Sequence, residues 1–163
     1  MDFLDMEINE SMAKKIMIVL VVLIFIYALI NLISYSFLSQ YTLGPETITN
    51  DENIRTGISV LERGSKMIEI QGWAYKQGQK IGVFDSCYIL RNQETGKMFK
   101  MKTSMEKVPE LMSVDDMYDC SNSGMHARCF IVGLSKGTYD VCVLYNNDNE
   151  DILADTGIVL VID

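Results

Sequence analysis

Hydrophobic and polar residues divide the chain into two parts with different patterns. From Ile16 to Ile30 every residue is apolar or aromatic, and apolar residues recur past Asn31 as far as Leu38. A helix of about 20 such residues crosses the hydrocarbon core of a bilayer, and a small soluble domain could not cover a helix that is apolar on every side. We therefore predict a transmembrane helix over residues 16–38, preceded by a cytoplasmic tail over residues 1–15.

The charges beside this segment predict its orientation. Lys14 and Lys15 precede it, whereas no Lys or Arg follows until Arg55. The positive-inside rule places the N-terminus in the cytoplasm and the C-terminal part outside, which predicts a single-pass protein of the cell membrane. A cleaved signal peptide is the competing interpretation. Because the apolar region of a signal peptide is usually only about 7–15 residues, an uncleaved signal anchor is favoured.

Asn31 is the one strongly polar residue in the span. In lipid, its amide would be able to hydrogen-bond to a neighbouring helix. Alternatively, it lies near the outer interface and contacts water or headgroups. We keep Asn31 as the candidate helix–helix contact.

After the helix, the pattern changes to short alternating runs separated by turns. Residues 39–56 are polar and turn-rich and are expected to form a stalk, and residues 57–163 are expected to form an extracellular β-sandwich domain. About seven short strands at this spacing predict a mainly β fold, an antiparallel sandwich with an immunoglobulin-like layout. The expected strands cover residues 58–62, 66–75, 85–92, 97–103, 126–132, 138–145 and 157–162, with one helical turn within 106–118.

Two aromatic positions carry specific expectations. Tyr139 follows the turn at Gly137 and enters an alternating strand, which is the pattern of a tyrosine corner, so we expect it to be structural. In residues 66–75, strict alternation places Trp73 and Tyr75 on the outer face, where they would suit sugar stacking. A bulge at Gly72 would instead turn Trp73 into the core, and both interpretations remain open.

Composition and charge narrow the class of protein. The chain has 163 residues and a net charge of −8, which argues against nucleic acid and anionic lipid surfaces as partners. The four cysteines, Cys87, Cys120, Cys129 and Cys142, all follow the helix, in the part expected outside, where disulfides persist. Their pairing cannot be deduced from the sequence, and their spacing does not indicate a zinc site.

Catalytic and metal-binding signatures are absent from the sequence. His126 is the only histidine, and no nucleophile elbow, P-loop, HExxH or dinucleotide fingerprint occurs. Two acidic groups, around residues 115–119 and 148–155, lack the spacing of an EF-hand loop and are interpreted as solvated loops. We expect no enzyme activity, no cofactor and no bound metal.

Four short motifs together carry a family resemblance: residues 68–74 (Ile-Glu-Ile-Gln-Gly-Trp-Ala), residues 118–124 (Tyr-Asp-Cys-Ser-Asn-Ser-Gly), residues 137–139 (Gly-Thr-Tyr) and residues 155–157 (Asp-Thr-Gly). Residues 58–163 resemble small extracellular β-sandwich domains associated with membrane proteins of Gram-positive cell-surface polysaccharide assembly. The resemblance implies an accessory role, because this chain carries no attached transferase or transporter. In such domains the Trp and Tyr are framework positions as often as contacts.

These observations predict a membrane-anchored accessory or binding protein that assists assembly, export or recognition of an envelope polysaccharide. The expected partners are the bilayer, a polytopic glycosyltransferase or transporter, and a glycan. Candidate contacts for the glycan or partner are Trp73, Tyr75, Tyr118 and Asn122. The alternatives are a structural or adhesion protein that binds another envelope protein, and an enzyme with an unrecognised site.

Overall fold

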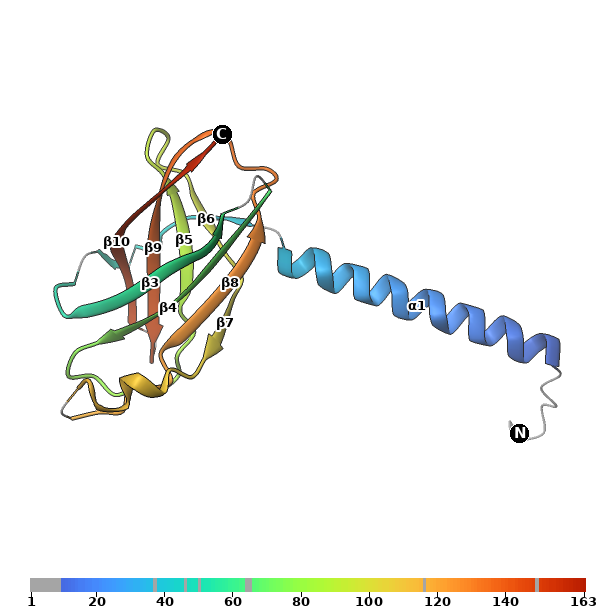
Figure 1. The fold of residues 1–163 in the computed structure, drawn as a ribbon, viewed down its shortest axis with the longest axis horizontal. Coiled ribbons are helices and arrows are strands. Elements are labelled where there is room, and N and C mark those ends of the chain that lie inside the picture. Colours follow the sequence, from blue (N-terminus) through green and yellow to red (C-terminus); the bar gives the residue numbers. More distant parts are fainter. Residues whose placement is uncertain are drawn as a thin grey trace. The chain divides into compact units, whose positions relative to one another are not determined.

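The computed structural model describes residues 10–36, 38–45, 47–49, 51–63, 66–115, 117–148 and 150–163. The chain divides into two compact units, Met1–Tyr35 and Ser36–Asp163 (Figure 1). The first contains one long helix and the second contains all of the strands.

Helix α1 (Glu10–Ser36) has 27 residues and contains the apolar segment expected to cross a membrane. Its stretch Ser11–Asn31 is long and apolar enough to do so. At 1.5 Å per residue, these 21 residues span about 30 Å, the thickness of a hydrocarbon core. The helix begins several residues before the predicted start at residue 16, because Lys14 and Lys15 continue it as ordinary helix formers.

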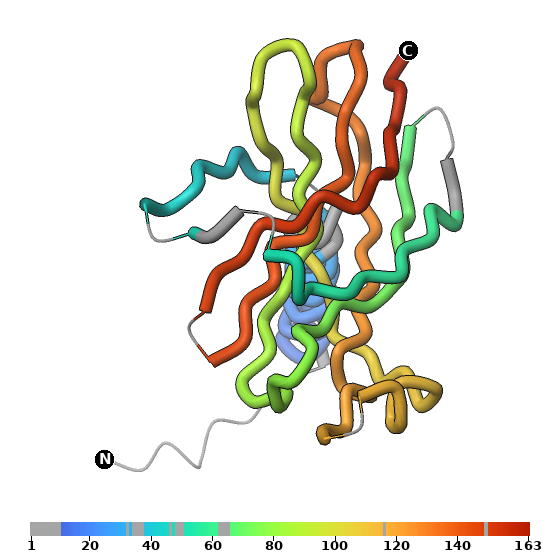
Figure 2. The backbone as a smooth tube through the Cα atoms, turned by 90° about the vertical axis from the view of Figure 1, so that its left-hand side faces the viewer, coloured from blue at the N-terminus to red at the C-terminus, as the bar shows by residue number. Residues whose placement is uncertain are grey.

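The second unit is a sandwich of two sheets (Figures 1 and 2). One sheet has six strands in the order β1-β6-β5-β9-β10-β2, and the other has four in the order β3-β4-β8-β7. Neighbouring strands pair antiparallel, except that β2 pairs parallel with β10. The strands are β1 (Ser39–Tyr41), β2 (Ile48–Thr49), β3 (Ile54–Arg63), β4 (Met67–Lys76), β5 (Cys87–Asn92), β6 (Met98–Lys100), β7 (Thr103–Glu106), β8 (Gly124–Phe130), β9 (Gly137–Asn147) and β10 (Glu150–Ile162).

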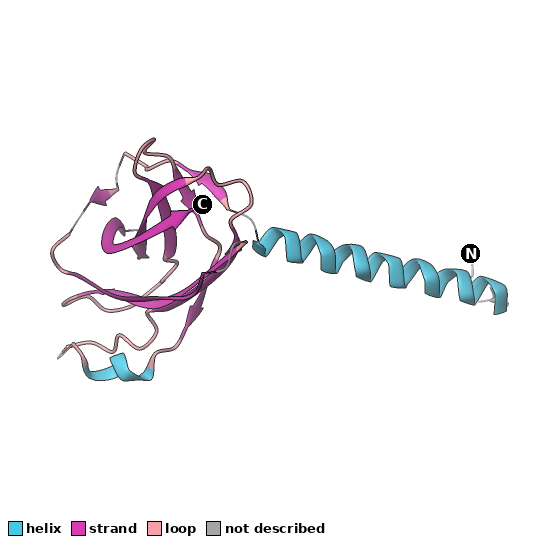
Figure 3. Ribbon diagram, turned by 45° about the horizontal axis from the view of Figure 1, so that its top comes forward, coloured by secondary structure: helices cyan, strands magenta, loops and turns pink. Residues whose placement is uncertain are grey.

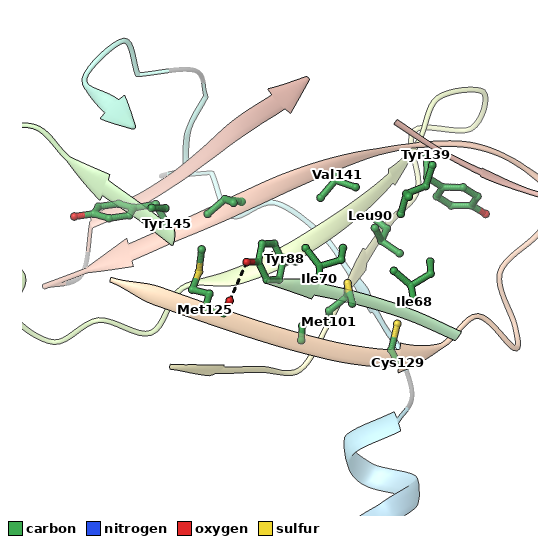
Figure 4. Packing of buried hydrophobic residues seen from close by; sticks show 14 of the residues in the cluster. Ile68, Ile70, Tyr88, Leu90, Met101, Met125, Cys129, Tyr139, Val141 and Tyr145 are labelled. Carbon is green, nitrogen blue, oxygen red and sulfur yellow. Dashed lines mark hydrogen bonds between the residues drawn. The ribbon is translucent and has the colours of Figure 1, made fainter. Parts of the chain in front are cut away.

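Side chains from both sheets fill the space between them (Figure 4). Ile68 and Ile70 of β4 and Met125 of β8 face Tyr88 of β5 and Val141 of β9 across this core. The Tyr88 hydroxyl donates a 3.1 Å hydrogen bond to the carbonyl oxygen of Met125 and so joins the two sheets inside the core. The mainly β class and the N-terminal apolar helix predicted from the sequence are therefore confirmed.

The described residues form ten strands rather than the seven expected. Residues 97–103, expected as one strand, are divided between β6 in one sheet and β7 in the other. The division occurs because Met101, fully buried, turns into the core where the chain crosses between the sheets. The helical turn expected within 106–118 is present as the 3-10 helix η1 (Pro109–Ser113), visible beside the strands in Figure 3.

Residues 39–56, expected as a stalk, instead contribute β1, β2 and the first residues of β3. Tyr41 and Leu43 pack on a second apolar cluster formed by Cys87, Ile89, Cys142, Leu144 and Leu153, whose side chains do not belong to the main core. These residues alternate along β5, β9 and β10 with core residues, so the six-stranded sheet is apolar on both faces and needs a cover on the second face. Because residues 39–56 are mostly polar, their few apolar positions gave no recognisable strand pattern in the sequence.

Strand β10 begins at Glu150, whereas the sequence predicted a strand only from residue 157. Ile152, Leu153 and Ala154 are buried, but the acidic residues around them obscured the pattern. Register with β9 shifts between Asp155 and Ile158, and Gly157 takes a positive φ of 75° at this bulge. The bulge therefore separates the early half of the strand from the half that was predicted.

Candidate functional site: an indole-lined groove on the four-stranded sheet

Strand β4 alternates between the core and the outer face of the four-stranded sheet. Ile68, Ile70 and Ala74 are buried in the main core, so Gln71 and Trp73 lie on the opposite face. Register with β8 is continuous from Met67 to Trp73, so β4 has no bulge at Gly72. The strict alternation is therefore confirmed, and Trp73 does not turn into the main core.

The Trp73 indole lies across the backbone of Gly57, its partner on β3. A Cβ atom at Gly57 would lie 2.4 Å from Cε2 and Cζ2 of the indole and 2.7 Å from Nε1, so only glycine permits this approach. The ring also stacks on Tyr75, with centroids 5.5 Å apart and planes inclined by 26°. The indole is thus held in one orientation by the strand beside it and by its aromatic neighbour.

Trp73 is half-buried, and Tyr75 is buried with an exposed fraction of 8%. Both belong to a third apolar cluster with Leu111 and Cys120, while Val108 and Ile81 pack around it. The segment that carries η1 thus covers Tyr75 and part of Trp73. A buried core residue and a fully exposed platform were the two expectations for Trp73, and its actual environment lies between them.

A groove of about 470 Å³ opens beside the indole. Its lining consists of residues Gly57, Ile58, Ser59, Leu61, Gln71, Gly72, Trp73 and Val108. Gly72 also allows close strand approach, because a Cβ atom there would lie 2.3 Å from the carbonyl oxygen of Gly57. The volume falls within the range of roughly 300–1,000 Å³ typical of small-ligand sites.

A network of polar side chains lies next to the groove on the same face. His126 Nε2 lies 2.8 Å from Glu69 Oε1, and His126 Nδ1 lies 3.6 Å from Glu106 Oε1. The Gln71 amide nitrogen, at the boundary of the groove, donates a 3.1 Å hydrogen bond to Glu106 Oε2. Because Glu106 accepts a hydrogen bond from the Gln71 amide nitrogen, the orientation of the amide is fixed. The Gln71 Oε1 atom is then the acceptor that the amide offers to a ligand.

The structure does not bring all four predicted contact residues to the groove. Trp73 lines the groove. Tyr75 does not line it but packs in the same apolar cluster as the Trp73 indole. Tyr118 is half-buried and Asn122 is exposed, and within the described residues neither is part of the groove lining. Tyr118 and Asn122 lie on the segment between η1 and β8, whereas Val108, which lines the groove, comes just before η1.

Sequence reasoning did not select Gly57, Ser59 or Leu61, which form the β3 side of the groove. Residues 58–62 were recognised as a strand, but the partner strand and its face could not be deduced. The available signal was Gly57 itself, because a glycine inside a strand often marks close approach of another group.

The cysteines and acidic clusters show no catalytic arrangement in the described part of the chain. All four cysteines are free and buried, and burial raises the pKa of Cys87 to about 11 and those of Cys129 and Cys142 to about 12. Such thiols remain protonated and are poor nucleophiles near neutral pH.

Asp115 and Asp119 accept backbone N–H groups rather than facing an open site. Asp115 Oδ2 accepts from the Gly78 N–H at 2.7 Å, and Asp119 Oδ1 accepts from the Ser121 N–H at 2.8 Å. The Gly78 bond is the main cause of the lowered pKa of Asp115. Across the described ranges, no three His, Cys, Asp or Glu side chains are arranged to hold a metal ion, and Asp116 lies outside those ranges.

Asn31, the candidate helix–helix contact, belongs to the other unit. Its side-chain Nδ2 donates a 2.8 Å hydrogen bond to the carbonyl oxygen of Tyr27, one turn earlier in α1. The amide nitrogen is therefore engaged within the helix, and Oδ1 remains as an acceptor for a partner.

Comparisons of the chain with protein-family models, with curated proteins and with solved structures found no match.

Proposed function

We propose that the chain is a single-pass membrane protein of the bacterial cell surface whose outer domain binds an envelope polysaccharide. One observation carries the proposal: the Trp73 indole is half-exposed in a groove beside a hydroxyl and an oriented amide. Aromatic rings offer a flat apolar surface to sugar C–H groups, and neighbouring polar side chains bind hydroxyls. Ser59 and Gln71 supply such groups here.

The outer domain is, in this proposal, an immunoglobulin-like module. The order β3-β4-β8-β7 matches the A-B-E-D sheet of that fold, and β6-β5-β9-β10 matches its C′-C-F-G sheet. A further similarity is the hydrogen bond from the Tyr139 hydroxyl to the Ser135 carbonyl oxygen at the start of β9, where a tyrosine corner lies. Modules of this fold commonly bind rather than catalyse, although fold alone does not decide function.

The proposed orientation places the N-terminus in the cytoplasm. Lys14 and Lys15 at the start of α1 support it through the positive-inside rule. A protease added to intact cells should therefore cleave a tag at the C-terminus and leave an N-terminal tag intact. The reverse cleavage pattern would contradict the orientation, and with it any contact between the groove and an outer polysaccharide.

The proposed role is accessory. The resemblance of residues 58–163 to domains associated with polysaccharide assembly favours it, and so does the lack of an activated nucleophile in the described groove lining. The polytopic partner, a glycosyltransferase or transporter, would be recruited through α1, with Asn31 Oδ1 as the acceptor left available by the bond to Tyr27.

The test is co-sedimentation of the full-length protein, in nanodiscs, with polysaccharide from the envelope of the cells that produce it. Trp73→Ala should weaken the affinity for the polysaccharide by roughly 5- to 150-fold, since loss of a stacked aromatic in a binding site costs roughly 1–3 kcal/mol. Val83→Ala is the matched control, because Val83 is an exposed apolar residue outside the groove lining. Equal binding by wild type and Trp73→Ala would refute the proposal.

A second candidate function, binding of another envelope protein, is favoured by one surface feature. Met112, Val114 and Met117, on η1 and the loop after it, are exposed apolar side chains, and methionine adapts well to protein surfaces. Met112→Ser combined with Met117→Ser should then abolish crosslinking to that protein while polysaccharide binding persists.

A further inference from the structure

The groove holds a preformed aromatic surface and carries no charge of its own. All of its lining side chains are apolar, aromatic, hydroxyl or amide groups, and the described lining includes no ionisable residue. Its two polar side chains, Ser59 and Gln71, are suited to hydroxyl groups. The described lining therefore offers no counter-charge to a negative or a positive ligand group.

The carboxylates of Glu69 and Glu106, beside the groove, do not supply a free charge, because both are already engaged. Glu106 contacts the Gln71 amide and His126, and Glu69 contacts His126. Glu69 Oε2 also lies 3.8 Å from Nε of Arg128. An ammonium group would have to displace these partners, and a carboxylate or phosphate would lose its hydration without a cation in the described lining to replace it.

Gly57 allows the indole to lie over the β3 backbone at the edge of this uncharged lining. A Cβ atom at this position would overlap the indole carbons at 2.4 Å, so any other residue would push the ring off the β3 backbone. Gly57 therefore determines which face of the indole is available for stacking and how wide the groove is. It does so although it has no side chain with which to contact a ligand.

Building on the proposed polysaccharide-binding function, we propose that the groove recognises an uncharged pyranose residue, and that Gly57 makes the stacking contact possible by positioning Trp73. The ring of the sugar packs against the indole, and a hydroxyl donates to Oε1 of Gln71. Uronic acids, phosphorylated sugars and free amino sugars are discriminated against, because their charged groups would lose hydration in the groove without a counter-charge in its described lining.

Intrinsic fluorescence tests the specificity directly, because Trp73 is the only tryptophan in the chain. The full-length protein should be kept in a polyoxyethylene detergent, since maltoside detergents carry the sugar ring under test. Matched trisaccharides are titrated: cellotriose, its N-acetylated chitin analogue, its deacetylated amine analogue and its uronate analogue, together with maltotriose and an α-linked uronate trimer. At least one neutral trisaccharide should shift the emission, and its charged analogues should bind at least about fivefold more weakly.

Variants separate positioning by Gly57 from general damage to the fold. Gly57→Ala should shift the emission of the free protein and reduce neutral-sugar affinity at least about tenfold. Gly44→Ala is the control, because a Cβ atom there meets only an ordinary contact with Thr47. If Gly57→Ala does not fold, Gln71→Leu gives an independent test, because it removes the amide and should weaken neutral sugars while the emission of the free protein stays unchanged.

The outcomes distinguish this inference from the function on which it rests. If a charged trisaccharide binds as tightly as the neutral ones, the specificity is wrong while polysaccharide binding stands. If Gly57→Ala binds normally, the positioning role of Gly57 is wrong while polysaccharide binding stands. If no neutral trisaccharide shifts the emission at about 10 mM, where even weak binding is detected, but envelope polysaccharide still co-sediments through Trp73, the inference again fails alone. If neither experiment depends on Trp73, both proposals fail.

Discussion

The Tyr139 hydroxyl donates a 2.8 Å hydrogen bond to the carbonyl oxygen of Ser135, four residues earlier, and closes the turn between β8 and β9. The Ser135 hydroxyl lies 3.0 Å from the same phenolic oxygen, and the Tyr139 side chain packs fully buried in the main core. One residue thus joins a surface turn to the interior, as the sequence pattern around Gly137 predicted.

Tyr139→Phe should lower the free energy of unfolding by about 1–2 kcal/mol, since it removes a hydrogen bond and leaves a carbonyl oxygen without its partner. Urea denaturation of the protein measures this change. Ser135→Ala is the matched control and should cost less, because the backbone carbonyl remains to accept from Tyr139. An equal loss in both variants would show that the side-chain contact, rather than the backbone bond, stabilises the turn.

Residues 38–56 should be required for a stable outer domain. A fragment beginning at residue 57 lacks β1, β2 and four half-buried side chains, Leu38, Tyr41, Leu43 and Ile54, that pack on the two larger clusters. At roughly 1 kcal/mol for each half-buried apolar side chain, the loss is about 4 kcal/mol, a large part of the stability of an ordinary domain. Thermal unfolding of fragments 37–163 and 57–163 makes the comparison. Equal midpoints would show that the segment contributes little.

The buried thiols should make the protein sensitive to alkali. The pKa of Cys87 is raised by burial to about 11, and burial raises those of Cys129 and Cys142 to about 12, above the ordinary value of 9.0. A group whose pKa is higher in the folded state contributes stability that is complete below its unfolded pKa and is lost as pH rises through the folded value. Stability should therefore fall between about pH 9 and pH 12.

Urea unfolding at pH values across this window, under reducing conditions, measures the loss. Cys129→Ala is less stable at neutral pH because it leaves a cavity, but its stability should decline less steeply with alkali, since one of the shifted groups is absent. A thiol reagent at pH 8 should modify the cysteines only after denaturation. Rapid modification of the native protein would contradict the buried, protonated thiols.

Asn31→Leu should leave α1 and the outer domain folded, because the bond from Asn31 to Tyr27 is local to the helix. If Oδ1 accepts a hydrogen bond from a partner helix, the substitution should weaken association by about 0.6–2 kcal/mol, or roughly 3- to 30-fold. Co-purification of a polytopic glycosyltransferase or transporter in mild detergent measures this loss. Ile30→Leu, an apolar exchange at the adjacent position, is the control, and unchanged recovery with Asn31→Leu would exclude this contact.

Features that depend on local pattern could be predicted from the sequence. The apolar run of α1 identifies a helix able to cross a membrane, because length and hydropathy suffice for that. The turn at Gly137 identified the role of Tyr139, whereas alternation along β4 gave the outer face as only one of two interpretations for Trp73. Each of these follows from the spacing of neighbouring residues and needs no knowledge of distant contacts.

The residues that lie opposite these positions could be identified only from the folded structure. The groove exists because register pairs Gly57 with Trp73, and Tyr75 is buried because the segment that carries η1 folds over it. Tyr41 and Leu43 form part of the folded domain because the six-stranded sheet has a second apolar face. Strand pairing and the covering of a sheet face join residues far apart in the chain, so no local pattern contains them.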